Sequence, residues 1–222
     1  TQVTELILSR LPATLLLLVG AILVELALGL AAGIWAANRR GEASDRAVMV
    51  LAFTAVSAPQ FVVGILLLYV FAVQLHWFPI GGYGTFSHLV LPALTLGVLG
   101  AGWYARMSRA SMLEALAQDY VTTARAKGAG RTRIVLVHAL RNAILAIVPM
   151  IGLDIGIFMS GAVVVESIYG WPGIGQLAWQ AIQRVDIPVI VGVTMVSAVG
   201  IVLGNLLADL VAPLIDPRIR LR

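Results

Sequence analysis

Long apolar segments separated by short polar ones dominate the chain. The apolar segments cover residues 11–37, 47–73, 88–105, 142–165 and 187–212. Each predicts a transmembrane helix, because a span needs about 20 predominantly apolar residues; the third is short. Pro59 lies inside the second segment, where neighbouring helices or water must satisfy the backbone carbonyl that it frees. The pattern predicts an all-α, polytopic protein with a single transmembrane domain over residues 1–222.

Composition supports a membrane protein. Hydrophobic residues make up 60% of the chain and charged residues 12%, with a mean hydropathy of +0.96. Soluble domains carry about 25% charged residues. The absence of cysteine from the sequence excludes disulfides, thiolate metal sites and a cysteine nucleophile. The net charge of +4 fits membrane topology better than nucleic-acid binding.

The basic residues predict the orientation of the chain. Thirteen of the fifteen Lys and Arg residues lie within 38–46, 106–141 and 216–222, and only Arg10 and Arg184 lie elsewhere. By the positive-inside rule, these three regions are cytoplasmic, while 74–87 and 166–186 lie outside. Thr1 then begins outside, and residues 1–10 do not resemble a signal peptide. We therefore expect a further span upstream, giving six in the intact protein.

The segment from Asp119 to Leu140 is the longest polar, charge-dense stretch. Apolar residues recur at helical spacing from just before this segment into it, at Leu113, Leu116, Tyr120 and Ala124. Gly128 and Gly130 end this helix, and Gly128, which closes it after Arg125 and Lys127, is expected at positive φ. Thr132 is a candidate N-cap for a second helix. Two short helices hinged at glycine on a membrane surface suggest a docking element. The alternative is a solvated basic connector.

The sequence shows no catalytic or metal-binding motif. It contains no HExxH, no GxSxG and no phosphate-binding glycine loop, and its three histidines lack metal-ligand spacing. An intramembrane enzyme is accordingly disfavoured. Three carboxylates, Glu25, Asp154 and Asp209, lie within apolar segments, where such groups face a bundle interior or an aqueous cavity. They could serve a substrate pathway, a proton relay or structural pairing, and pairing is favoured for Asp209.

Paired glycines predict close helix packing. The pairs are Gly29 with Gly33, Gly152 with Gly156 and Gly200 with Gly204, each at the spacing that lets two backbones approach.

Several motifs in a fixed order resemble the permeases of the dipeptide/oligopeptide/nickel family of ABC importers. They are Ser57-x-Pro59-x-Phe61, Tyr120-Val121-x-Thr123-Ala124-Arg125-Ala126-Lys127-Gly128, His138-Ala139-Leu140-Arg141-Asn142-Ala143, Glu166-x-Ile168-x-x-Trp171-Pro172-Gly173-x-Gly175, Asn205-Leu206-Leu207-x-Asp209 and Asp216-Pro217-Arg218-Ile219-Arg220. Thr122-Thr123-Ala124 stands where the general permease loop has Glu-Ala-Ala, and Arg141 where it has proline; both departures are typical of the peptide branch.

The resemblance implies a type I importer permease without an active site or cofactor of its own. The cytoplasmic coupling loop, 106–141, would dock on an ATPase. The residues implied in docking are Asp119, Tyr120, Thr123, Ala124, Arg125, Ala126, Lys127, Gly128, Arg131 and Arg133. The implied partners are a second permease subunit, two cytoplasmic ATPase subunits that hold ATP and Mg, and an external binding protein. The implied location is the inner membrane of a bacterium or archaeon.

The translocation pathway and the cargo are less constrained by the sequence. Candidate pathway residues are Glu25, Ser57, Gln60, Asp154 and Met159. Dipeptides, oligopeptides, nickel chelates and other small solutes all fit this branch. A proton-driven secondary transporter that uses Glu25 and Asp154 is the alternative, although such a carrier would need no docking loop.

Overall fold

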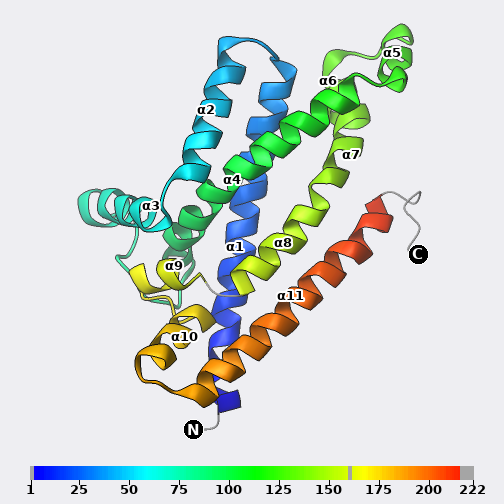
Figure 1. Ribbon diagram of the computed structural model, residues 1–222. Helices are drawn as coiled ribbons and strands as arrows, with labels where there is room; N and C mark the ends of the chain where they lie inside the picture. The colour runs from blue at the N-terminus through cyan, green and yellow to red at the C-terminus, as the bar shows by residue number, and fades with distance from the viewer. Residues whose placement is uncertain (1–2, 160–161, 216–222) are drawn as a thin grey trace.

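The computed structural model describes residues 3–159 and 162–215, and these ranges contain helices and loops but no strand. The helices are α1 (Val3–Asn38), α2 (Ala43–Ser57), α3 (Gln60–Leu67), η1 (Leu68–Gln74), α4 (Phe86–Leu116), α5 (Asp119–Ala126), α6 (Arg131–Arg133), η2 (Ile134–Ala139), α7 (Leu140–Ala143), η3 (Ile144–Ala146), α8 (Val148–Met159), α9 (Val163–Ile168), α10 (Ile174–Gln183) and α11 (Ile187–Ile215) (Figure 1). The basic tail, 216–222, and its motif lie outside the described residues.

Helices α1 and α4 make the most extensive helix–helix contact. Their backbones meet at Gly29 and Gly33, where an added Cβ would lie 2.9 Å from the Ala101 carbonyl oxygen and 2.6 Å from that of Ala105, respectively. No side chain fits at such a distance, so glycine is required for this approach. The predicted role of this glycine pair is confirmed.

Helices α8 and α11 form a second close pair. A Cβ at Gly152 would lie 2.7 Å from Cβ of Ala208, and one at Gly200 would lie 2.7 Å from Cε of Met159. Gly156 and Gly204 face Ile201 and Ile155 across the same interface. The other two glycine pairs therefore pack these two helices against each other, as the sequence predicts.

The predicted single helix over 47–73 is wrong, because the structure divides it into α2 and α3, with a bend of 104° between them. The bend lies at Ala58 and Pro59, both extended, with φ −73° and −63°. The proline ring disfavours helical geometry in the residue before it, and α2 ends at Ser57, before Ala58 and Pro59.

The fourth apolar segment and the outer loop also differ from expectation. The segment is bent by 43° between Arg131–Ala146 and Val148–Met159. Residues 163–165, expected to finish that span, instead begin the separate helix α9. The region 166–186, expected to be a loop, includes part of α9 and all of α10. The sequence shows turn signals such as Gly170 and Pro172. It does not show that side chains of α9 and α10 are buried against the rest of the protein, which stabilises these short helices.

Three helices, α1, α4 and α11, are long and apolar enough to cross a membrane. The number rises to five if each bent pair forms one span. Large apolar side chains on these elements are exposed, for example Leu23 (61%), Leu51 (68%) and Val202 (65%). Exposed apolar side chains of this kind are suited to lipid or to a partner helix.

A polar cluster lies among the apolar side chains of α1, α4 and α8. The hydroxyl of Tyr104, which is 1% exposed, donates a hydrogen bond to Oδ2 of Asp154. Glu25, 2% exposed, lies next to the same carboxyl, in space left by the missing side chain of Gly100. The expectation that Asp154 points into the bundle is therefore confirmed.

Asp154→Asn is expected to assemble better than Asp154→Leu. Asparagine keeps a carbonyl oxygen for the Tyr104 hydroxyl, whereas leucine leaves that buried donor unpaired at a cost of about 1–3 kcal/mol. The measurement is the midpoint of thermal aggregation of each purified variant, with wild type as the reference. Equal midpoints for the two variants would show that this hydrogen bond does not stabilise the bundle.

Cysteines introduced at the two ends of the bundle test its orientation. We expect a membrane-impermeant thiol reagent to label Arg184→Cys only from outside and Glu42→Cys only from the cytoplasm. Both positions are exposed, and the cysteine-free sequence provides the unlabelled control. Labelling of Arg184→Cys from the cytoplasmic side alone would reverse the predicted topology.

Candidate functional site

Glycine ends the helix α5, in the segment predicted to be cytoplasmic, through a defined cap. The N–H of Gly128 donates to the Arg125 carbonyl at 2.9 Å, and the N–H of Ala129 donates to the Ala124 carbonyl at 3.0 Å. This pair of bonds is the Schellman motif, which needs a left-handed residue at the glycine position. Gly128 has φ +80°, so the predicted positive φ is confirmed.

The helix boundaries of this segment differ from those predicted. The helical spacing from Leu113 to Ala124 covers two helices rather than one, because the chain breaks between α4 and α5 at Ala117 and Gln118. Gln118 is extended, with ψ 152°, and precedes α5 as its N-cap. Gly130 caps α6, so the prediction of Thr132 as N-cap is wrong. Residues 106–116, expected to be part of the loop, continue α4.

The segment from α5 to η2 has its own small core. Val121 is fully buried and Ala124 is 9% exposed, and both pack with Ile134, which is 4% exposed. Leu116, at the end of α4, and Ala129 complete this cluster. A core of this kind makes the segment a folded element continuous with α4, and not a loose connector.

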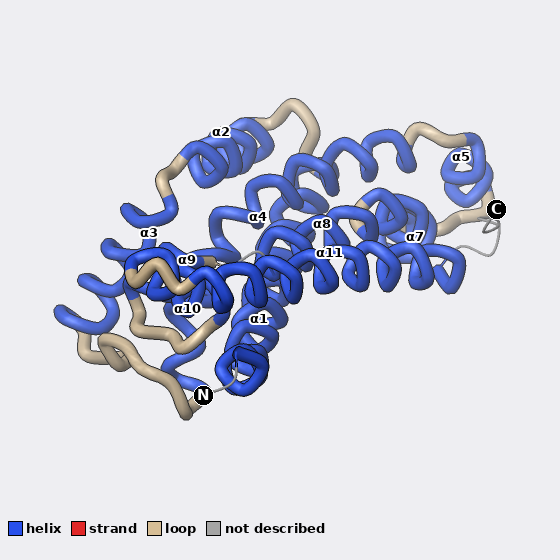
Figure 2. Tube along the Cα trace, turned by 60° about the horizontal axis from the view of Figure 1, so that its bottom comes forward, coloured by secondary structure: helices blue, strands red, loops and turns tan. Residues whose placement is uncertain are grey.

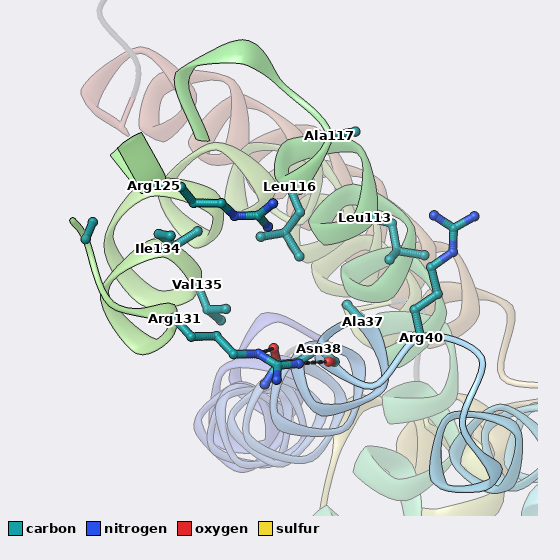
Figure 3. Close-up of a pocket in the computed structure, with 11 residues that line it drawn as sticks. Ala37, Asn38, Arg40, Leu113, Leu116, Ala117, Arg125, Arg131, Ile134 and Val135 are labelled. Atoms are coloured by element: carbon teal, nitrogen blue, oxygen red, sulfur yellow. Dashed lines mark hydrogen bonds between the residues drawn. The ribbon is translucent and has the colours of Figure 1, made fainter. Parts of the chain in front are cut away.

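Arg131 connects the folded segment from α5 to η2 to the C-terminal end of α1 through hydrogen bonds. Its Nε donates to Oδ1 of Asn38 at 2.9 Å, and Nη2 donates to the carbonyl oxygen of the same residue (Figure 3). A cation at a helix C-terminus is also favoured by the helix dipole. Next to this hydrogen-bonded contact, a buried apolar cluster contains Ala37, Met112 and Val135. It joins α1, α4 and η2.

This element, residues 119–140, has two faces. One lines a cavity of about 570 Å³ shared with the ends of α1 and α4, and Arg125 and Arg131 contribute to it (Figure 3). The other forms a groove of about 500 Å³, lined by six of the predicted docking residues: Tyr120, Thr123, Ala124, Lys127, Gly128 and Arg133. Asp119 and Ala126 are exposed on α5. Figures 1 and 2 place α5 at the end of the molecule opposite α9 and α10.

A partly buried ion pair holds the connection between α1 and α2 against α4. Oδ1 of Asp45 accepts from Nε of Arg109 at 2.6 Å, and Oδ2 accepts from Nη2 at 2.7 Å. The N–H of Gly41 also donates to Oδ2 at 3.0 Å. The Arg109 guanidinium lowers the pKa of Asp45, in the predicted cytoplasmic segment 38–46, to about 2. Bidentate geometry of this kind fixes orientation as well as charge.

The structure brings together only part of the predicted pathway set. Glu25 and Asp154 adjoin each other beside Tyr104. Ser57 and Gln60 lie instead at the bend between α2 and α3. Met159 is 4% exposed and packs in the main hydrophobic cluster. Tyr104 was missed from the sequence, although a tyrosine hydroxyl inside an apolar segment implies a hydrogen-bond partner.

A second residue missed from the sequence is Glu166, which is completely buried although it was assigned to a loop. Its carboxylate accepts from the N–H of Gln176 at 2.7 Å and from the Thr14 hydroxyl at 3.4 Å. Burial raises the pKa of the Glu166 carboxyl. The same Thr14 hydroxyl accepts from the N–H of Ile174, and Nε1 of Trp171 donates to the Ala13 carbonyl. These bonds fasten α9 and α10 to α1.

Within residues 3–159 and 162–215, no group of three or more His, Cys, Asp or Glu side chains could hold a metal ion. The described residues do contain two prominent features. One is the folded basic element at residues 119–140, and the other is the buried hydrogen-bond network of Glu166, Thr14 and Trp171 at the opposite end.

Two curated relatives match nearly the whole chain. The oligopeptide transport system permease protein AppB of Bacillus subtilis (strain 168) is 40% identical over 99% of this chain and 72% of its own length. The glutathione transport system permease protein GsiC of Escherichia coli (strain K12) is 40% identical over 98% of this chain and 71% of its own length.

The fold also has a solved counterpart. The inward-facing MetNI methionine ABC transporter contains a chain that superposes with a TM-score of 0.80 at 19% identity, covering 95% of this chain and 96% of that one. This likeness establishes the all-α importer permease fold. Residues 29–221 match the family described as the binding-protein-dependent transport system inner membrane component. The chain belongs to this family and is a permease subunit of an ABC importer.

Proposed function

We propose that this permease carries peptides or a similar small solute and is coupled to cytoplasmic ATPases through residues 119–140. It would act in a bacterial inner membrane with a second permease subunit, two ATPase subunits and an external binding protein. The ATPases would hold ATP and Mg, and this chain would have no active site of its own. The names of the relatives, which specify oligopeptides and glutathione, support this class of cargo.

The observation that carries the coupling role is the folded, two-sided element at 119–140. Its core of Val121, Ala124 and Ile134 keeps α5 and η2 together, and Arg131 anchors it to α1. A rigid element fastened to two long helices can transmit a rigid-body displacement, whereas a flexible connector would absorb it. When ATP closes the ATPases, the docked element would move with them and turn the pathway from inward to outward access.

The groove on the outer face of this element suits a protein partner. Thr123 and Gly128 are small and exposed, so that another surface can come close to the backbone. Lys127 and Arg133 supply positive charge at the rim, where charges steer association and set orientation. Tyr120, 36% exposed, adds an aromatic side chain of the kind enriched at interfaces.

For the pathway, we propose Glu25, Asp154, Ser57, Gln60 and Met159 as in the sequence-based prediction. Glu25 and Asp154 would act together, because they adjoin in one cluster. Proton-driven transport, the alternative, finds no support among the relatives, which are permeases of transport systems.

Gly128→Val is expected to leave the protein in the membrane but impair uptake and substrate-stimulated ATP hydrolysis. A β-branched residue at φ +80° costs about 1–3 kcal/mol of backbone strain, and α5 would relieve it by tilting. A Cβ at this position meets no atom within 4 Å, so crowding contributes nothing. The assay is uptake and ATPase activity of the reconstituted complex, with and without the external binding protein.

Gly130 provides the matched control for this variant. It also has open space for a Cβ, but its φ is −67°, which any residue adopts. Gly130→Val should therefore transport almost normally, and Gly128→Asn should be milder than Gly128→Val because asparagine tolerates left-handed geometry. Normal transport by Gly128→Val would return this segment to the role of a connector.

Arg133→Gln is expected to weaken assembly with the ATPases in a salt-dependent way. An exposed rim charge contributes about 0.2–1 kcal/mol, which corresponds to a loss of up to about fivefold in affinity. The loss should shrink between low and high ionic strength, because salt screens exposed charges. Titration of ATPase onto the reconstituted permease measures it, and a salt-independent loss would contradict a rim role.

A further inference from the structure

We call residues 119–140 the coupling element. The cavity behind it combines an apolar floor with a basic rim. Its floor consists of Ala37 from α1, Leu113 and Leu116 from α4, and Ile134 and Val135 from η2. Its rim carries Arg40, Arg125 and Arg131, and no acidic residue is among the lining side chains (Figure 3). At about 570 Å³, it has room for a small polar group together with an adjoining hydrocarbon portion.

The positive charge of this cavity has no counter-ion in the described part of the chain. The ion pairs there join Arg39 to Glu42 and Arg109 to Asp45, and so leave the rim arginines out. Among the described residues, the Arg131 side chain donates to Asn38, which is uncharged. Because arginine stays protonated at any physiological pH, three like charges line one cavity. An anion placed among them would relieve that repulsion.

Guanidinium groups favour phosphate, since their planar N–H pairs match two phosphate oxygens. The floor adds a second preference, because a free inorganic anion gains nothing from five apolar side chains. The location adds a third: Asn38 and Leu116 end two helices long enough to span the membrane, on the side that basic residues mark as cytoplasmic. On that side, a phospholipid of the inner leaflet offers a phosphate together with an apolar portion.

We propose that this cavity binds the phosphate of an anionic phospholipid from the cytoplasmic leaflet. Arg125 and Arg40 coordinate the phosphate, Arg131 completes the rim, and the first part of the acyl chains rests on Leu113, Leu116 and Val135. The bound lipid joins α5 to the end of α1 and so holds the coupling element in position. The groove on the opposite face of residues 119–140 stays available to a protein partner. Of its lining residues, only Ala129 also lines this cavity.

The test compares two double variants that remove equal charge from the two faces. The cavity variant, Arg40→Gln/Arg125→Gln, removes two of the three positive charges at the rim of the cavity. The groove variant, Lys127→Gln/Arg133→Gln, removes two positive charges from the opposite groove. Each permease is reconstituted without ATPases into vesicles of phosphatidylglycerol and phosphatidylcholine. Native mass spectrometry then counts the phosphatidylglycerol retained after delipidation, and expression and membrane insertion of each variant are checked first.

We expect wild type and the groove variant to retain one phosphatidylglycerol, and the cavity variant to lose it. Equal losses in both variants would mean general attraction of anionic lipid to basic residues, and would overturn the proposal. So would retention of phosphatidylglycerol by the cavity variant, which would show that the rim arginines do not hold the lipid. Since the ATPases are absent from the lipid measurement, its outcome is independent of the coupling role.

A second arm separates the two possible sources of phosphate. Permease in vesicles of phosphatidylcholine alone is heated with inorganic phosphate or with added phosphatidylglycerol. We expect phosphatidylglycerol to raise the aggregation midpoint of wild type and not of the cavity variant, and millimolar inorganic phosphate to leave both unchanged. Stabilisation of wild type by inorganic phosphate alone would show a soluble anion site and contradict the assignment to lipid.

Discussion

Close contact between the backbones of α1 and α4 determines where nearly every other feature lies. Gly29 and Gly33 let α1 approach Ala101 and Ala105, so two helices of 36 and 31 residues run together over much of their length. This contact places Tyr104 beside Glu25, and it brings the end of α1 to the end of α4. Residues 119–140, the proposed coupling element, pack on that shared end, and Asp45 and Arg109 hold the adjoining turn in place.

The resulting molecule is fastened differently at its two ends. At one end, Glu166 and Trp171 fix α9 and α10 to α1 through buried hydrogen bonds. At the other, a small apolar core and one arginine fix α5 and η2 to the same helix. Since α1 takes part in both attachments and in the central carboxyl cluster, it is the element through which a displacement at one end could reach the other. This arrangement fits the proposed function, in which the pathway responds to partners on both sides of the membrane.

Much of this fold could be predicted from sequence, because hydrophobic length and paired glycines carry direct physical meaning. The positive φ of Gly128 also followed from its place after Arg125 and Lys127. The bend at Ala58 was missed, since a proline within an apolar run permits either a mild kink or a full break, and the choice depends on packing. Glu166 was assigned to a loop because a carboxylate has no local pattern that reveals burial. The two faces of the coupling element depend on the contact of Arg131 with Asn38, which lies 93 positions away in sequence.

The account depends most on the claim that the groove face of residues 119–140 meets the ATPase. Thr123 is exposed on that face, so a photoreactive amino acid placed there should capture the ATPase subunit in the assembled transporter. The same amino acid at Trp179, 47% exposed on α10 at the opposite end, serves as the control. The account predicts a cross-link to the ATPase from Thr123 and none from Trp179. Failure to capture the ATPase from Thr123 in an active, assembled transporter would contradict it.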